Sequence, residues 1–189
     1  MRPVSRRVGA AAPLVAGGCW LIYAYIVKQF DPSYYRPIAF VDYLAVALYS
    51  AGLLLLAPTV AGIHARQHTH AGLDERIGFW MAFAGGLMAG IGDFGEDWVR
   101  VEPMGHWLLL PGMLLLLIGL ALLGVGTMRA KVLPTWCGGL LLLSPIVGGP
   151  LRGLFSNWSG TLLFGLIWMT LGFALWFDHR NATKHEGKE

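Results

Sequence analysis

Long runs of apolar residues, separated by short polar segments, dominate the chain. A membrane-spanning helix needs about 20 mostly apolar residues. Six stretches approach that length, at residues 8–27, 41–64, 77–98, 106–128, 133–151 and 159–177. The loops between them are short, which favours antiparallel neighbours in one bundle. We therefore predict an all-α, polytopic transmembrane helix bundle with six spans that forms a single transmembrane domain over residues 1–189.

Composition agrees with this pattern. The 189 residues are 56% hydrophobic and 13% charged, with a mean hydropathy of +0.57. Soluble domains are usually about 45–50% apolar and about 25% charged. The difference excludes a disordered tail, a coiled coil and an ordinary soluble enzyme. The expected partner is the lipid bilayer, and no nucleic acid is expected, because the chain has no long basic run.

The distribution of lysine and arginine predicts the orientation. Three of these residues precede the first span, two lie in the second loop, two in the fourth loop and three in the tail. The other side has only four, namely Lys28, Arg36, Arg100 and Arg152. Because positive charge concentrates on the cytoplasmic side, both termini are predicted to lie in the cytoplasm.

The segment Asp93–Arg100 holds the main candidate chemistry. On a helix, Asp93, Glu96, Asp97 and Arg100 would share one face, since helical neighbours are three and four residues apart. If the helix leaves the membrane near Val101, Asp93 lies about 12 Å inside it. A carboxylate facing lipid at that depth costs about 2–3 kcal/mol, so Asp93 is expected to face the bundle and to have a partner.

The predicted partner of Asp93 is Arg152. Counted from the starts of their helices, Asp93 lies about 24 Å along the third span and Arg152 about 29 Å along the fifth. Two prolines and a glycine pair between Ser144 and Pro150 should kink or end the fifth helix early. We therefore expect an outward-facing acidic cavity with binding residues Asp93, Glu96, Asp97, Arg100, Arg152 and His106. The alternative is that Asp93 pairs structurally while the other acids are solvated at a helix end.

Small residues at four-residue spacing mark the third span. Ala82, Gly86 and Gly90 form one such row, and Gly85, Ala89 and Asp93 form another. Such rows let helix backbones approach closely in membranes. The first row is expected to pack inside the bundle or to join two protomers in a homo-oligomer.

Three histidines lie near the end of the second span. His64 and His68 are spaced so that they could share a helix face, and His70 follows. No cysteine or well-placed carboxylate completes a metal-ligand set, so we expect a solvated loop without metal. Only His64 and His106 approach the bilayer closely enough for haem, and they do so from opposite sides. We predict no cofactor.

Three segments resemble one group of proteins. They are Leu53–Leu56 with Gly62–Gln67, then Met128–Trp136, and finally Leu171–Trp176. Together they resemble small multi-helix membrane proteins of high-GC bacteria, a group without an assigned activity. The resemblance implies a bacterial inner-membrane protein and transfers no site residue.

Three functional interpretations follow from the sequence. A transport protein would bind a cation or proton at the buried acids. A membrane enzyme of the isoprenoid or lipid cyclase or isomerase type would use Asp93, Glu96 or Asp97 as general acid. Its cationic intermediate would be stabilised by Trp80, Phe94 and Trp98. The third interpretation is a non-catalytic accessory protein, and the sequence leans narrowly toward a role without catalysis.

Overall fold

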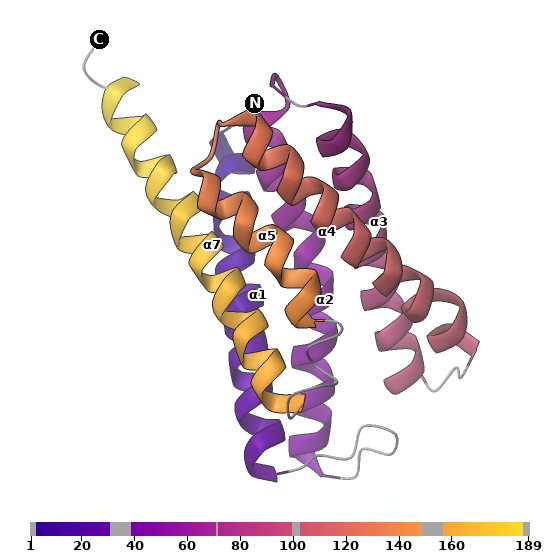
Figure 1. Ribbon diagram of the computed structural model, residues 1–189. Helices are drawn as coiled ribbons and strands as arrows, with labels where there is room; N and C mark the ends of the chain where they lie inside the picture. Colours follow the sequence, from indigo (N-terminus) through magenta and orange to yellow (C-terminus); the bar gives the residue numbers. More distant parts are fainter. Residues whose placement is uncertain (1–2, 31–38, 71, 100–102, 149–156, 187–189) are drawn as a thin grey trace.

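The protein is a bundle of helices. The computed structural model describes residues 3–30, 39–70, 72–99, 103–148 and 157–186, and within these ranges it describes no side chain of 3–8, 157 or 178–186. The helices are α1 (Pro3–Phe30), α2 (Phe40–Gln67), α3 (Leu73–Asp97), the π-helical turn η1 (Gly105–Leu109), α4 (Leu110–Ala130), α5 (Thr135–Gly148) and α7 (Asn157–Glu186) (Figure 1). No strand occurs in the described ranges, which confirms the predicted all-α class.

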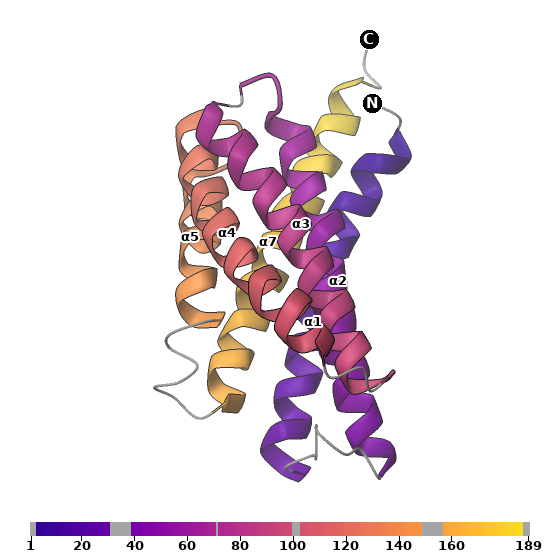
Figure 2. The same cartoon turned by 90° about the vertical axis from the view of Figure 1, so that its right-hand side faces the viewer.

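The helices form a closed ring. Each packs against the next in the chain, with η1 continuing into α4, and α7 returns to pack against α1 (Figures 1 and 2). The start of α1 and the end of α7 lie at the same end of the bundle. We call this end the termini side and the other end the opposite side.

Five helices are long and apolar enough to cross a membrane. These spans are Gly9–Phe30, Phe40–Gln67, Leu73–Asp97, Gly105–Ala130 and Trp158–Phe177. The chain therefore has the build of a multi-pass membrane protein. The stretch predicted as a further span, 133–151, contains the shorter α5 with 14 residues. At about 1.5 Å per residue α5 is about 21 Å long, less than the roughly 30 Å hydrocarbon core. The prediction of six spans is therefore supported for five helices only.

A glycine seam joins α3 to α4. Four glycines follow each other at seven-residue intervals: Gly105, Gly112, Gly119 and Gly126. They meet a row on α3 with the same interval: Glu96, Ala89, Ala82 and Glu75, respectively. A Cβ added to Gly112 would lie 2.5 Å from the backbone nitrogen of Ala89, so the two backbones are in direct contact. Close backbone approach is how membrane helices gain packing energy without a hydrophobic driving force.

The predicted row Ala82, Gly86 and Gly90 is covered by the same chain. All three residues are buried. Ala82 meets Gly119 of α4, whereas Gly86 and Gly90 face α2, where a Cβ on Gly90 would lie 2.6 Å from the Leu54 side chain. Of the two roles expected for this row, the structure therefore shows packing inside the bundle. The row is not free to receive a second protomer.

Candidate functional site

Asp93 lies one turn before the end of α3 and faces α2. Its side chain is only 5% exposed. The Ser50 hydroxyl, on α2 and also buried, donates to Asp93 Oδ2 at 2.5 Å. A carboxylate in this position is surrounded by protein and receives a charge-assisted hydrogen bond. Ser50 could not be identified as a partner from the sequence, and the predicted partner, Arg152, lies outside the described residues.

Glu96 faces a different neighbour. Its carboxylate lies directly against Gly105, and a Cβ at that position would collide with Glu96 Oε2. Gly105 belongs to the first turns of the helix that continues as α4. The partial positive charge at a helix N-terminus favours a carboxylate there. Gly105, the first glycine of the seam, therefore makes room for an acidic side chain rather than for a neighbouring backbone.

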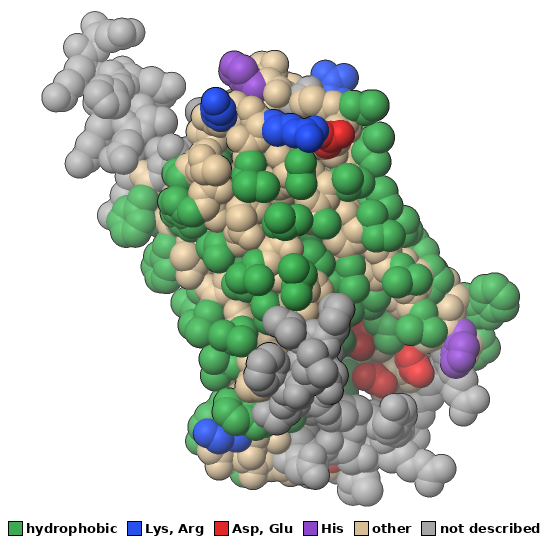
Figure 3. Space-filling model, in the orientation of Figure 1, with side chains coloured by type: hydrophobic (Ala, Val, Ile, Leu, Met, Phe, Trp, Pro, Cys, Tyr) green, Lys and Arg blue, Asp and Glu red, His purple; other side chains and the backbone are tan. Residues whose placement is uncertain are grey.

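The predicted acidic group is divided between two interfaces. Because α3 lies between α2 and α4, Asp93 turns toward α2 and Glu96 toward α4. Asp97 is half-buried at the last residue of α3, and His106 is exposed. Arg100, predicted on the same face, lies outside the described residues. Acidic side chains still emerge together on the opposite side of the molecule (Figure 3).

The aromatic residues near the acids point outward. Trp98 packs against Phe94 at 5.7 Å and against Tyr43 at 5.9 Å between ring centroids. Phe94 and Trp98 are exposed, and so is Trp80, which lies 13 residues before Asp93 and about 20 Å from it along α3. Exposed aromatic rings at the end of a span are typical of the membrane–water boundary. These rings do not enclose the carboxylates, so they do not build the cation-stabilising pocket expected of a cyclase.

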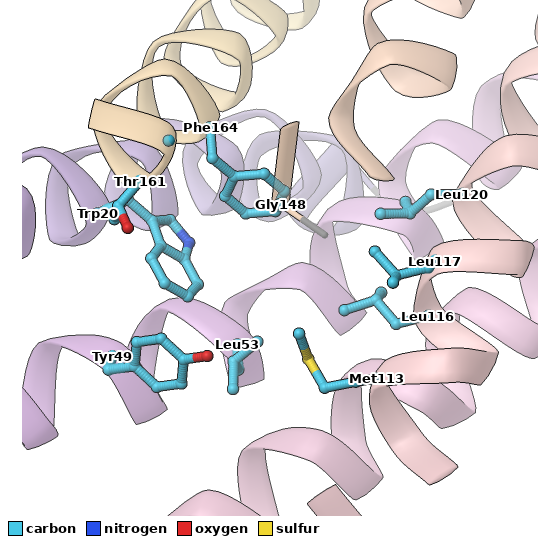
Figure 4. Close-up of a pocket in the computed structure, with 11 residues that line it drawn as sticks. Trp20, Tyr49, Leu53, Met113, Leu116, Leu117, Leu120, Gly148, Thr161 and Phe164 are labelled. Carbon is cyan, nitrogen blue, oxygen red and sulfur yellow. The ribbon is translucent and has the colours of Figure 1, made fainter. Parts of the chain in front are cut away.

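A cavity lies inside the ring of helices (Figure 4). Five helices line it, and the lining residues are Trp20, Tyr49, Leu53, Met113, Leu116, Leu117, Leu120, Gly148, Gly160, Thr161 and Phe164. The space between these side chains, including its open part, is about 420 Å³, and little of it is wide enough for a water molecule. The cavity is therefore narrow, and its walls are almost entirely apolar.

Aromatic rings form one wall of this cavity. Trp20 stands edge-on to Tyr49 at 4.9 Å and to Phe164 at 5.2 Å between ring centroids. Tyr23 packs behind them, 5.2 Å from Tyr49. Edge-to-face contacts of this kind add stability beyond the burial of area. The four rings therefore form one contiguous aromatic cluster beside the cavity.

A second polar cluster lies on the termini side, where α2, α3 and α4 meet. Glu75 is completely buried, and its Oε1 accepts a hydrogen bond from Gln67 Nε2 at 3.1 Å and lies 2.8 Å from His64 Nδ1. Gln67 Nε2 also donates to Thr127 Oγ1 at 3.1 Å. The His64 ring stacks on Phe79 with centroids 4.1 Å apart. Side chains from three helices thus tie the ends of those helices together.

The sequence reasoning missed this cluster because it grouped His64 with the other histidines. His68 and His70 are exposed and lie apart from Glu75, each bonded to a near neighbour in the chain. No group of three or more histidine, cysteine or acidic residues suited to a metal occurs among the described residues. A usable signal was present: Glu75 and Glu96 continue the seven-residue row of the two alanines on α3, which predicts that both carboxylates lie on the α4 seam.

Comparison of the chain with protein-family models, with curated proteins and with solved structures gave no match.

Proposed function

We propose that the protein is a multi-pass inner-membrane protein that binds a slender lipophilic molecule inside its ring of helices, in a transport or accessory role. The observation that carries this proposal is the narrow cavity between α1, α2, α4, α5 and α7. Small-molecule sites are mostly apolar, and in helical bundles they lie between the helices. The cavity wall agrees with this, because it consists almost entirely of aromatic rings, leucines and Met113.

The depth of the cavity supports a guest that comes from the bilayer. Trp20 and Leu120 lie in the middle parts of two spanning helices, about 10 residues or more from the nearer helix end. A polar solute would lose its hydration there and find few partners. A hydrocarbon chain loses nothing comparable, because it moves from one apolar environment to another.

Binding is favoured over catalysis. None of the described residues that line the cavity is an acid, a histidine or a lysine. Asp93, the best buried candidate for a general acid, is turned toward Ser50 at the α2–α3 interface. The cyclase or isomerase interpretation needs an acid at the reacting atoms and aromatic faces around them. The exposure of Trp80, Phe94 and Trp98 counts against it.

The proposed orientation places both termini in the cytoplasm, because the side of the termini has the excess of lysine and arginine. In that orientation Glu96 and Asp97, two residues of the predicted outward-facing acidic cavity, lie on the outward side. Glu75 and His64 then lie near the cytoplasmic boundary. A negative outer surface would attract cationic solutes or partners to the ring without supplying a binding site inside it.

Photolabelling tests the proposal. The protein in lipid nanodiscs would be irradiated with a palmitate-length methyl ester that carries a diazirine at the chain end, and the adducts mapped by mass spectrometry. We expect adducts on cavity-lining residues, and a several-fold loss of these in Met113→Phe or in Leu117→Phe, which fill the cavity. The control is Leu114→Phe on the same helix, at a side chain that is 63% exposed.

The outcomes separate the functions. Adducts confined to outward-facing residues, and equal in the filled variants and the control, would overturn the proposal. Recovery of a chemically altered ester, with the alteration lost in Asp93→Asn, would replace binding by the enzyme interpretation. Adducts in the cavity with the ester recovered unchanged support binding.

A further inference from the structure

Trp20 brings a hydrogen-bond donor to the cavity wall. Its side chain is only 4% exposed. Its Nε1 has no hydrogen-bond partner among the described residues. Figure 4 shows this nitrogen directed into the space between Phe164, Leu53 and the Tyr49 hydroxyl. The indole also packs directly on Gly52 of α2, where an added Cβ would be 2.8 Å from Nε1.

A buried donor without an acceptor is unfavourable and uncommon. Native structures satisfy nearly all such groups, and an exception needs an explanation. The ring face of Phe164 offers at most a weak acceptor. A water molecule would need two to four polar partners to be held in this place. Among the other lining residues only Tyr49 and Thr161 carry a hydroxyl group, and the remaining side chains are apolar.

The geometry points to a neutral lipid whose carbonyl oxygen accepts a hydrogen bond from Trp20 Nε1 while its chain occupies the apolar part of the cavity. This assignment of ligand chemistry rests on the proposed function, since it concerns the same cavity. The narrow space favours a slender acyl ester or ketone over a bulky ring.

The direction of the indole also excludes a cationic headgroup at this point. Aromatic cages bind cations through ring faces, where the electrostatic potential is negative. Trp20 instead directs its N–H edge at the cavity, and that edge is positive. An ammonium group would be repelled by it, whereas a carbonyl oxygen would be attracted.

Competition against the photolabel tests the assignment. The competitors are a methyl ester, a methyl ketone and an alkane of equal chain length, and a ring quinone with a short alkyl tail. One hydrogen bond to a buried donor corresponds to about tenfold in affinity. We expect the ester and the ketone to displace the cavity adducts at about tenfold lower concentration than the alkane. A stronger effect of the quinone than of the ester would identify a ring carbonyl rather than an acyl ester as the source.

Two variants make the test specific. Trp20→Phe removes the N–H and keeps an aromatic ring, so the preference for the ester over the alkane should fall to about one. Trp168→Phe is the matched control, because Trp168 Nε1 is equally buried and without a described partner but does not line the cavity. It should leave the preference unchanged.

The failures are distinguishable. Absence of cavity adducts in the unaltered protein would overturn the proposed function itself. Cavity adducts displaced equally by ester and alkane would overturn only the assignment to Trp20, and this comparison needs no variant. Equal losses of preference in Trp20→Phe and Trp168→Phe would show that the effect reflects general packing and not a hydrogen bond, which also overturns the assignment.

Discussion

Replacing Gly112 by alanine should weaken the α3–α4 seam. The new Cβ would lie 2.5 Å from the backbone nitrogen of Ala89 and 2.9 Å from the carbonyl carbon of Met88. Ordinary contact needs about 3.5 Å, so the helices must separate by about 1 Å at this point. Overpacking typically costs about 1–3 kcal/mol, and a clash with backbone belongs at the upper end. Alanine regains up to about 1 kcal/mol of helix propensity. We expect a net destabilisation of about 2 kcal/mol.

The matched controls are Gly18→Ala in α1 and Gly139→Ala in α5. An added Cβ at either position meets nothing within 4 Å. These changes should be neutral or stabilising by up to about 1 kcal/mol, because only the backbone effect remains. Unfolding of the purified protein by SDS in mixed micelles, followed by circular dichroism, measures all three. If Gly112→Ala proves as stable as the two controls, the close backbone contact between α3 and α4 at Gly112 does not contribute to stability, and the prediction is wrong.

Three further changes test other parts of the structure. Ser50→Ala removes the hydroxyl that donates to Asp93 and should cost about 1–3 kcal/mol in the same unfolding assay, and less when Asp93→Asn is also present. Glu75→Leu should be clearly destabilising, because it removes the hydrogen-bond acceptor from a buried polar cluster. Asp74→Ala should cost less than about 1 kcal/mol, because its partner Arg129 is 72% exposed. Equal losses of stability in the two variants would contradict the burial of Glu75. Reporter fusions at the C-terminus should be active in the cytoplasm, and an exported reporter would reverse the proposed orientation.

The helices could be predicted from the sequence because the thickness of the hydrocarbon core sets the length of a spanning helix. Apolar runs of about 20 residues must become helices that satisfy their own backbone hydrogen bonds. This rule is met less well in the stretch 133–151, where the described helix α5 (Thr135–Gly148) has 14 residues. Pro134 directly precedes this helix and Pro145 lies inside it. The length of an apolar run alone therefore does not give the length of the helix that forms in it.

The partners of the buried acids could be predicted only in part. Burial of Asp93 follows from the cost of placing a carboxylate in lipid. The identity of Ser50 as its donor does not, because it depends on the rotation of α2, a helix without a strong apolar stripe from which its orientation could be derived. Glu75 was open to prediction, since it lies seven residues before Ala82 and on the same helical row. A search for small residues at seven-residue as well as four-residue spacing identifies Glu75 as part of this row.

The positions of the two buried acids on α3 determine whether ions could move along this helix. Glu75 and Asp93 are about 27 Å apart along the helix axis. The buried α3 residues between them are glycine, alanine and phenylalanine only. No side chain of α3 between the two carboxylates carries an oxygen atom. Asp93 is bonded to Ser50 near one end of α3, and Glu75 is bonded to Gln67 near the other end. Conduction through the apolar interior of the ring would meet a cost of desolvation. The proposed ligand agrees with this arrangement, because a lipid chain needs no polar contacts over most of its length.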